Sequence, residues 1–187
     1  RSMGFKINGD IACTMIASDA KKSFFVKVKR QDSPEKNPYY EVFELPYKPN
    51  LNIISCLQAI ASNPVTVDGK QSTPVVWDCS CLEEVCGACT MVMGGQVGQS
   101  CSTLVDELIE RDGTGTKDNP ITLEPMSKFP VVRDLFVDRS SMFANLKDIK
   151  GWVPIDGTHD LGAGPKEDPE AQELRYQLSR CMTCGCC

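Results

Sequence analysis

The sequence predicts an α+β domain followed by a mainly helical C-terminal segment. Strand-like segments at 24–30, 39–47, 90–93 and 121–125 surround one early helical pattern at 53–62. This mixture is typical of an α+β domain. Beyond Pro130, apolar residues recur at helical spacing instead. The cysteines gather at two places, one inside the first domain and one at the end of the chain.

Residues 24–62 contain the first predicted elements. FFVKVKR (24–30) and YYEVFELPY (39–47) alternate between apolar and polar residues, and the turn-rich QDSPEKNP between them indicates a hairpin. Asn52 is a suitable N-cap for a helix over 53–62, which Asn63-Pro64 would end. Cys56 lies on the apolar face of this helix, so we expect it in the core rather than at a metal.

Further strands and two helical stretches complete the predicted elements. TMVM (90–93) and QVGQSC (96–101) flank Gly94-Gly95, which is a strong signal for a two-residue hairpin turn. ITLEP (121–125) is predicted to be another strand. Residues 131–152 show helical spacing, 153–169 are rich in Gly, Pro and Asp and indicate a long loop, and 170–180 resume a helical pattern.

The composition excludes several classes of protein. A net charge of −5 over 187 residues does not indicate a nucleic-acid surface. No apolar run approaches the roughly 18 residues that would span a bilayer. Only one histidine is present, which excludes a Rieske centre and a Cys2His2 zinc finger. An odd number of cysteines, 11, without a convincing export signal argues against a secreted disulfide scaffold and favours metal binding.

The first cysteine group has the spacing of a 2Fe–2S site. CSCLEEVCGAC contains one C-x4-C-x2-C arrangement, formed by Cys81, Cys86 and Cys89. This is the plant-type spacing, and the cluster needs a fourth thiolate from elsewhere. Structural zinc on four cysteines is the alternative, although zinc sites usually pair two C-x2-C units and this segment contains only one, Cys86 and Cys89. Cys79 is two residues out of register, so we expect it to be a bystander.

The predicted hairpin supplies the fourth cysteine. With Gly94-Gly95 as the turn, Thr90 pairs with Gln99, and continuing the count places Cys101 beside Ala88 and Cys89. We therefore predict a 2Fe–2S cluster on Cys81, Cys86, Cys89 and Cys101.

The second cysteine group lies at the end of the chain. CMTCGCC carries Cys181, Cys184 and Cys187 at the spacing that begins the bacterial 4Fe–4S run C-x2-C-x2-C-x3-C-P, with Cys186 off the pattern. The sequence stops before a fourth cysteine. We therefore expect an incomplete 4Fe–4S site in a chain that is truncated at its C-terminus.

Four segments carry a family resemblance. WDCSCLEEVCGACTMVMGGQVGQSC, FPVVRDLFVDRSSMF, GWVPIDGTHDLG and SRCMTCGCC resemble the iron–sulfur subunit of succinate dehydrogenase and fumarate reductase, in its Bacillus-like bacterial form. The resemblance covers roughly 22–187, and 1–21 is an extension of unclear status. It implies a β-grasp 2Fe–2S ferredoxin-like domain over 22–138, followed by a linker and the start of an α-helical ferredoxin domain over 139–187.

The resemblance also implies a function and partners. The subunit would relay electrons between the flavin of a flavoprotein catalytic subunit and quinone, held at the membrane by a cytochrome b-type anchor subunit. It would sit peripherally, on the cytoplasmic face of the inner membrane. Cys81, Cys86, Cys89 and Cys101 match the 2Fe–2S ligands of the family. Cys181, Cys184 and Cys187 match three 4Fe–4S ligands.

The resemblance places the remaining ligands outside the sequence. The fourth 4Fe–4S ligand and all ligands of a 3Fe–4S cluster would lie beyond Cys187, in the full-length parent. No residue for substrate chemistry is expected on this chain. Two rival functions remain: the iron–sulfur subunit of another flavin-linked oxidoreductase, and a zinc-stabilised interaction module.

Overall fold

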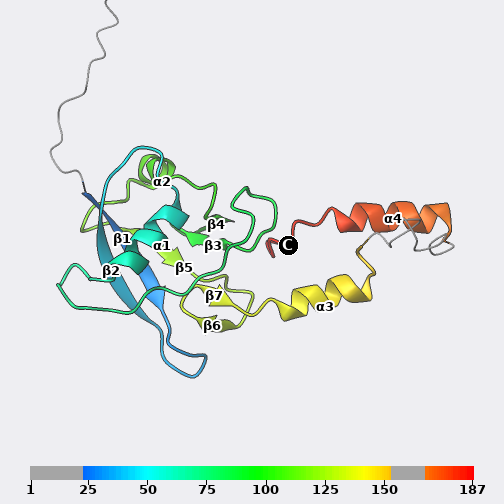
Figure 1. Ribbon diagram of the computed structural model, residues 1–187, viewed down its shortest axis with the longest axis horizontal. Coiled ribbons are helices and arrows are strands. Elements are labelled where there is room, and N and C mark those ends of the chain that lie inside the picture. The colour runs from blue at the N-terminus through cyan, green and yellow to red at the C-terminus, as the bar shows by residue number, and fades with distance from the viewer. Residues whose placement is uncertain (1–22, 153–166) are drawn as a thin grey trace, which may run out of the picture.

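The computed structural model describes residues 23–152 and 167–187. Its main feature is a five-stranded mixed sheet in the order β2-β1-β5-β3-β4 (Figure 1). The strands are β1 (Ser23–Arg30), β2 (Tyr39–Pro46), β3 (Thr90–Met93), β4 (Gln96–Gln99) and β5 (Ile121–Glu124). The α+β prediction is confirmed for this domain. The extension 1–21 and most of the predicted loop 153–169 lie outside the described residues.

The alternation of apolar and polar residues in β1 and β5 places one face of these strands on the core. Side chains of β1 alternate between buried and partly exposed positions, as expected for a strand with one face on the core. β1 pairs antiparallel with β2, in the predicted hairpin, and parallel with β5. The core between sheet and helices is built largely from alternate strand residues, including Val26, Val28, Ile121 and Leu123.

Helix α1 (Ile53–Ser62) has the predicted bounds and cap. The Oδ1 atom of Asn52 accepts a hydrogen bond of 2.8 Å from the backbone N–H of Ser55, which satisfies a free donor of the first turn. Cys56 is 1% exposed within the core, as expected. Burial raises the pKa of its thiol to about 12, which makes it a poor metal ligand.

The sequence analysis missed one helix. Helix α2 (Val105–Asp112) follows β4 directly and buries Val105 and Leu108. The backbone N–H of Leu104 donates to the Glu107 carboxylate at its start, and Gly113 ends it at a positive φ of 62°. Eight residues with only two buried positions give too short a pattern to recognise.

The helical prediction for 131–152 was wrong in its first part. Residues Val131–Arg133 and Phe136–Val137 form two short strands, β6 and β7, and only Ser140–Asp148 forms a helix, α3. Asp134 separates the strands at a φ of 50°, which a continuous helix does not allow. Its carboxylate is held by the buried Arg30, so tertiary contacts override the local pattern.

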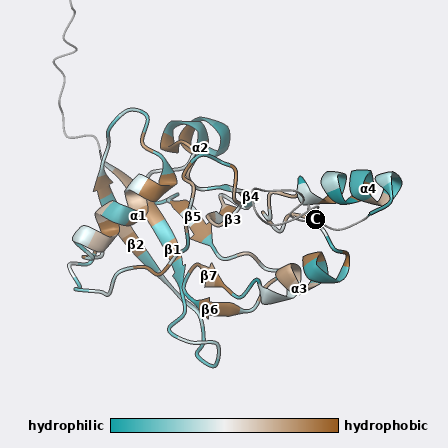
Figure 2. Cartoon of the chain, turned by 45° about the vertical axis from the view of Figure 1, so that its right-hand side comes forward, coloured by the Kyte–Doolittle hydropathy of each residue, from teal (hydrophilic) through white to brown (hydrophobic). Residues whose placement is uncertain are grey.

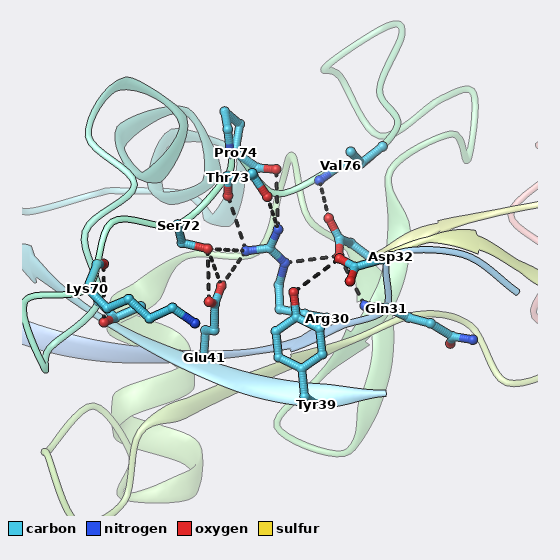
Figure 3. A network of polar contacts seen from close by, with 12 residues as sticks. Arg30, Gln31, Asp32, Tyr39, Glu41, Lys70, Ser72, Thr73, Pro74 and Val76 are labelled. Atoms are coloured by element: carbon cyan, nitrogen blue, oxygen red, sulfur yellow. Dashed lines mark hydrogen bonds and ion pairs between the residues drawn. The ribbon is translucent and has the colours of Figure 1, made fainter. Parts of the chain in front are cut away.

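Arg30 is the centre of a buried polar network (Figure 3). It is 0% exposed and pairs with Glu41 on β2 at 2.5 Å and with Asp134 at 3.0 Å. Its remaining N–H groups donate to the loop at 72–74. Asp134 in turn accepts from the backbone N–H of Val76 at 2.9 Å. The network therefore fixes the chain that leads into the first cysteine loop.

The C-terminal helices stand apart from the sheet. α3 and α4 (Pro169–Ser179) carry no buried residue, and α4 is mostly hydrophilic (Figure 2). The helix predicted over 170–180 is confirmed, with Asp168 as its N-cap. After α4 the chain returns toward the sheet domain, so its end lies near the cysteine loop (Figure 1). No helix in 23–152 or 167–187 is long and apolar enough to cross a membrane.

Candidate functional site

The predicted hairpin brings Cys89 and Cys101 together. β3 and β4 pair in the predicted register, with Thr90 opposite Gln99 and Met93 opposite Gln96. Beyond the strands, the N–H and hydroxyl groups of Ser100 donate to the carbonyl of Cys89 at 3.3 and 2.9 Å. Cys89 and Cys101 are both buried and share a small apolar cluster with Ile54 and Trp77.

Cys81 and Cys86 form a second pair in the loop before β3. The backbone N–H groups of Glu83, Val85 and Cys86 donate to Sγ of Cys81 at 3.3–3.4 Å. The Glu83 and Val85 donors, followed by the adjacent Cys86 thiol, lower the pKa of Cys81 to about 7. Sγ of Cys86 itself accepts from the N–H groups of Cys81 and Ala88, both at 3.4 Å. The sulfur of Cys81 therefore lies where donors stabilise a thiolate.

The Cys81–Cys86 pair and the Cys89–Cys101 pair lie close together. Burial and the adjacent Cys89 thiol raise the pKa of Cys101, while the N–H of Glu84 donates to its sulfur and opposes that rise. The loop N–H groups turn inward because Leu82 and Glu84 take positive φ angles of 59° and 56°. Across 23–152 and 167–187, no group of three or more His, Cys, Asp or Glu side chains converges as a single-ion site.

Cys79 lies beside this group but is exposed. Burial and the neighbouring Asp78 raise the pKa of its thiol, in contrast to Cys81. Cys79 receives none of the backbone donors that reach Cys81 and Cys86. Its local environment therefore differs from that of the two loop cysteines of the predicted motif.

The second cysteine segment, residues 181–187, lies beside α3. Cys181, Cys184 and Cys187 line one cavity of about 310 Å³, whose other walls are mostly apolar residues of α3 and the 128–129 turn. Cys184 is half-buried, while Cys181 and Cys187 are exposed. The N–H of Thr183 donates to Sγ of Cys181 at 3.4 Å, the same N–H···S arrangement that occurs around Cys81.

The structure also brings the two cysteine groups into contact, which the sequence analysis did not predict. The hydroxyl of Thr183 donates to the carbonyl of Cys86 at 2.7 Å. Arg139 donates to the carbonyls of Gly87 and Thr183. Nothing in the spacing of the motifs pointed to Arg139, because it lies 52 residues from Gly87 and 44 from Thr183.

Comparison with known proteins agrees with this geometry. Residues 25–144 match the family model described as a 2Fe-2S iron-sulfur cluster binding domain. The chain is 54% identical to the succinate dehydrogenase iron-sulfur subunit of Bacillus subtilis, covering 86% of this chain and 60% of the relative. It is 26% identical to the fumarate reductase iron-sulfur subunit of Wolinella succinogenes, covering 83% of this chain and 59% of the relative. The resemblance seen in the sequence is confirmed.

A solved structure has the same fold. A chain of the Mycobacterium smegmatis Sdh1 complex superposes with a TM-score of 0.57 at 18% identity, covering 88% of this chain and 62% of that chain. The present chain thus spans about 60% of the length of the curated relatives it matches.

Proposed function

The chain belongs to the family of 2Fe–2S iron–sulfur cluster binding domains, and from this membership we propose that it is the electron-transfer part of a succinate dehydrogenase or fumarate reductase. The chain would relay electrons between the flavin of a catalytic subunit and quinone. The cofactor would carry the redox chemistry, and the protein would supply its ligands, its orientation and its electrostatic surroundings. The resemblance to the Bacillus subtilis subunit supports this choice within the family.

One observation carries the proposal: four cysteines lie as two contacting pairs, one on the loop and one across the hairpin. A 2Fe–2S cluster takes four thiolates, two on each iron. The Cys81–Cys86 pair and the Cys89–Cys101 pair match that demand, and the N–H donors around Cys81 suit a ligand that must be deprotonated. We therefore propose these four residues as the 2Fe–2S ligands.

The second cysteine segment would contribute to a 4Fe–4S site. Cys181, Cys184 and Cys187 open into one cavity whose wall is partly apolar, and apolar neighbours help to exclude solvent from a cluster. Three thiolates leave this site incomplete within the sequence. The family resemblance would add a fourth ligand and a 3Fe–4S cluster, for which this sequence supplies no cysteines in register. The C-terminal segment, from 139, would then begin an α-helical ferredoxin domain.

The proposed partners follow from the proposed reaction. A flavoprotein subunit would supply electrons to the chain, or accept them from it. A cytochrome b-type membrane anchor would hold the complex and bind quinone. The chain would lie peripherally, on the cytoplasmic face of the inner membrane. The exposed apolar residues Leu82 and Val85 on the cysteine loop lie close to the proposed cluster ligands and could contact another subunit.

Anaerobic spectroscopy of the assembled complex tests the proposal. Reduction should produce a rhombic EPR signal of a 2Fe–2S cluster, and succinate added to the oxidised complex should elicit part of it. A signal obtained with dithionite but never with succinate or a quinol would point to another flavin-linked oxidoreductase. A colourless protein that contains stoichiometric zinc would refute the iron–sulfur assignment.

A further inference from the structure

Two cysteine segments that lie far apart in the sequence touch through their backbones. One Nη atom of Arg139 donates to the carbonyl of Gly87 at 2.9 Å and to that of Thr183 at 3.0 Å. Gly87 belongs to the first cysteine loop, and Thr183 belongs to the second cysteine segment. A single side chain therefore bridges both groups.

Gly87 allows an unusually close approach at this point. A Cβ atom on Gly87 would lie 2.5 Å from both the N and Cα atoms of Cys184, which is closer than real Cβ atoms come to backbone. The φ angle of Gly87 is +68°, which an L-residue adopts only at a cost. The hydroxyl of Thr183 adds a hydrogen bond of 2.7 Å to the carbonyl of Cys86. The contact is thus built from backbone atoms and the Thr183 hydroxyl, at or next to one proposed ligand in each group.

The guanidinium of Arg139 is held in place from two other directions. It forms an ion pair with Asp78 at 3.6 Å and lies over the ring of Phe143 at 5.8 Å from the ring centroid. The side chain is only 13% exposed. Asp78 precedes the first cysteine loop and Phe143 belongs to α3, so these two contacts orient the guanidinium that donates to the two carbonyls. Solvent competition for these hydrogen bonds is correspondingly weak.

We propose that Arg139 is a positioning residue that holds the second cysteine segment against the first cysteine loop and thereby sets the separation of the two clusters. This inference rests on the proposed function. In each transfer one electron leaves one cluster, which is oxidised by one unit, and enters the other, which is reduced by one unit. No proton or group moves. Because electron transfer slows steeply with distance, a side chain that fixes the separation controls the rate.

Arginine is suited to this position for a geometric reason. Its planar fork presents several fixed N–H donors, so it reaches two carbonyls while its other edge pairs with the Asp78 carboxylate. Lysine would keep the positive charge but concentrate it on one small ammonium group. Arg139→Lys should therefore retain part of the contact, and Arg139→Met should lose it.

The first test measures the contact itself, independently of any electron transfer. Backbone amide hydrogen exchange of residues 182–185 is followed in the purified chain. In Arg139→Met we expect exchange roughly tenfold faster, because two charge-assisted hydrogen bonds are lost. The isosteric Thr183→Val should accelerate it less. Arg111→Met is the matched control, since Arg111 donates to Asp112, Gln96 and Met93, outside both cysteine groups, and it should behave as the wild type.

The second test measures the distance between the two clusters in the complex that contains both of them. The magnetic interaction between the two reduced clusters broadens the 2Fe–2S EPR signal and speeds its relaxation. In Arg139→Met the 2Fe–2S signal should keep its integrated intensity but relax more slowly, with Arg139→Lys intermediate. Unchanged relaxation together with unchanged amide exchange would overturn the inference and leave the proposed function intact. A wild-type complex without a 2Fe–2S signal would refute the proposed function instead, and the exchange data would still decide the role of Arg139 in the contact.

Discussion

Replacing Arg30 with methionine should destabilise the first domain strongly. Arg30 and Asp134 are both 0% exposed at the side chain and Glu41 is 8% exposed. The change leaves the buried Glu41 carboxylate without a cation, and leaves Asp134 only Arg133, whose Nε lies 4.0 Å away. Removing one partner of a buried ion pair typically costs about 3–5 kcal/mol. This is a large part of the roughly 5–15 kcal/mol that holds a domain folded.

Urea unfolding followed by far-UV circular dichroism under anaerobic conditions measures this loss. With an m value of about 2 kcal/mol per M, the midpoint should fall by about 2 M. Arg111→Met is the matched control, because the Arg111–Asp112 pair is partly exposed at 38% and 21% and should contribute only about 0–1 kcal/mol. Adding Glu41→Gln to Arg30→Met should restore part of the midpoint by removing one unpaired charge. A midpoint shift no larger than that of the control would refute the reasoning.

Three further predictions concern the cysteine groups. Cys101→Ser should abolish or severely weaken the 2Fe–2S EPR signal, whereas Cys79→Ser should leave it intact; loss in both variants would contradict the ligand assignment. One residue inserted between Gly94 and Gly95 should lower the iron content after reconstitution, because a one-residue shift turns the following side chains to the other face, and wild-type iron content would show that the turn does not hold the fourth ligand. Gly87→Ala should cost about 1–2 kcal/mol from its left-handed backbone alone and should also displace the second cysteine segment, which faster amide exchange at 182–185 would reveal; unchanged exchange would show that the close approach is not required.

The hairpin and its register could be predicted from the sequence because they depend on local chemistry. Gly94 and Gly95 take φ angles of 59° and 80°, which glycine adopts without strain, so the turn position follows from the residue type. Once the turn is placed, the period of the strands fixes which residues face each other. The pairing of Thr90 with Gln99 and the approach of Cys101 to Cys89 follow from counting. The α1 helix and its Asn52 cap are local in the same way.

Other features depend on contacts that the local sequence does not encode. Residues 131–137 have apolar residues at helical spacing, yet the Arg30–Asp134 pair, 104 residues apart, forces a turn at Asp134. Leaving either charge of that buried pair without its partner would cost about 3–5 kcal/mol, which exceeds the small preference that periodicity expresses.

The meeting of the two cysteine groups is the clearest case. Each cysteine motif can be recognised from the sequence without the other, because the spacing of the thiolate ligands is set by the cluster that they would bind. That Gly87 contacts Cys184, and that Arg139 bridges their neighbours, depends on how the chain returns after α4 to the cysteine loop. The sequence therefore determined which residues could hold clusters, whereas only the tertiary structure decided how the two sites lie against each other, since that arrangement arises from hydrogen bonds and close packing between segments with no shared local pattern.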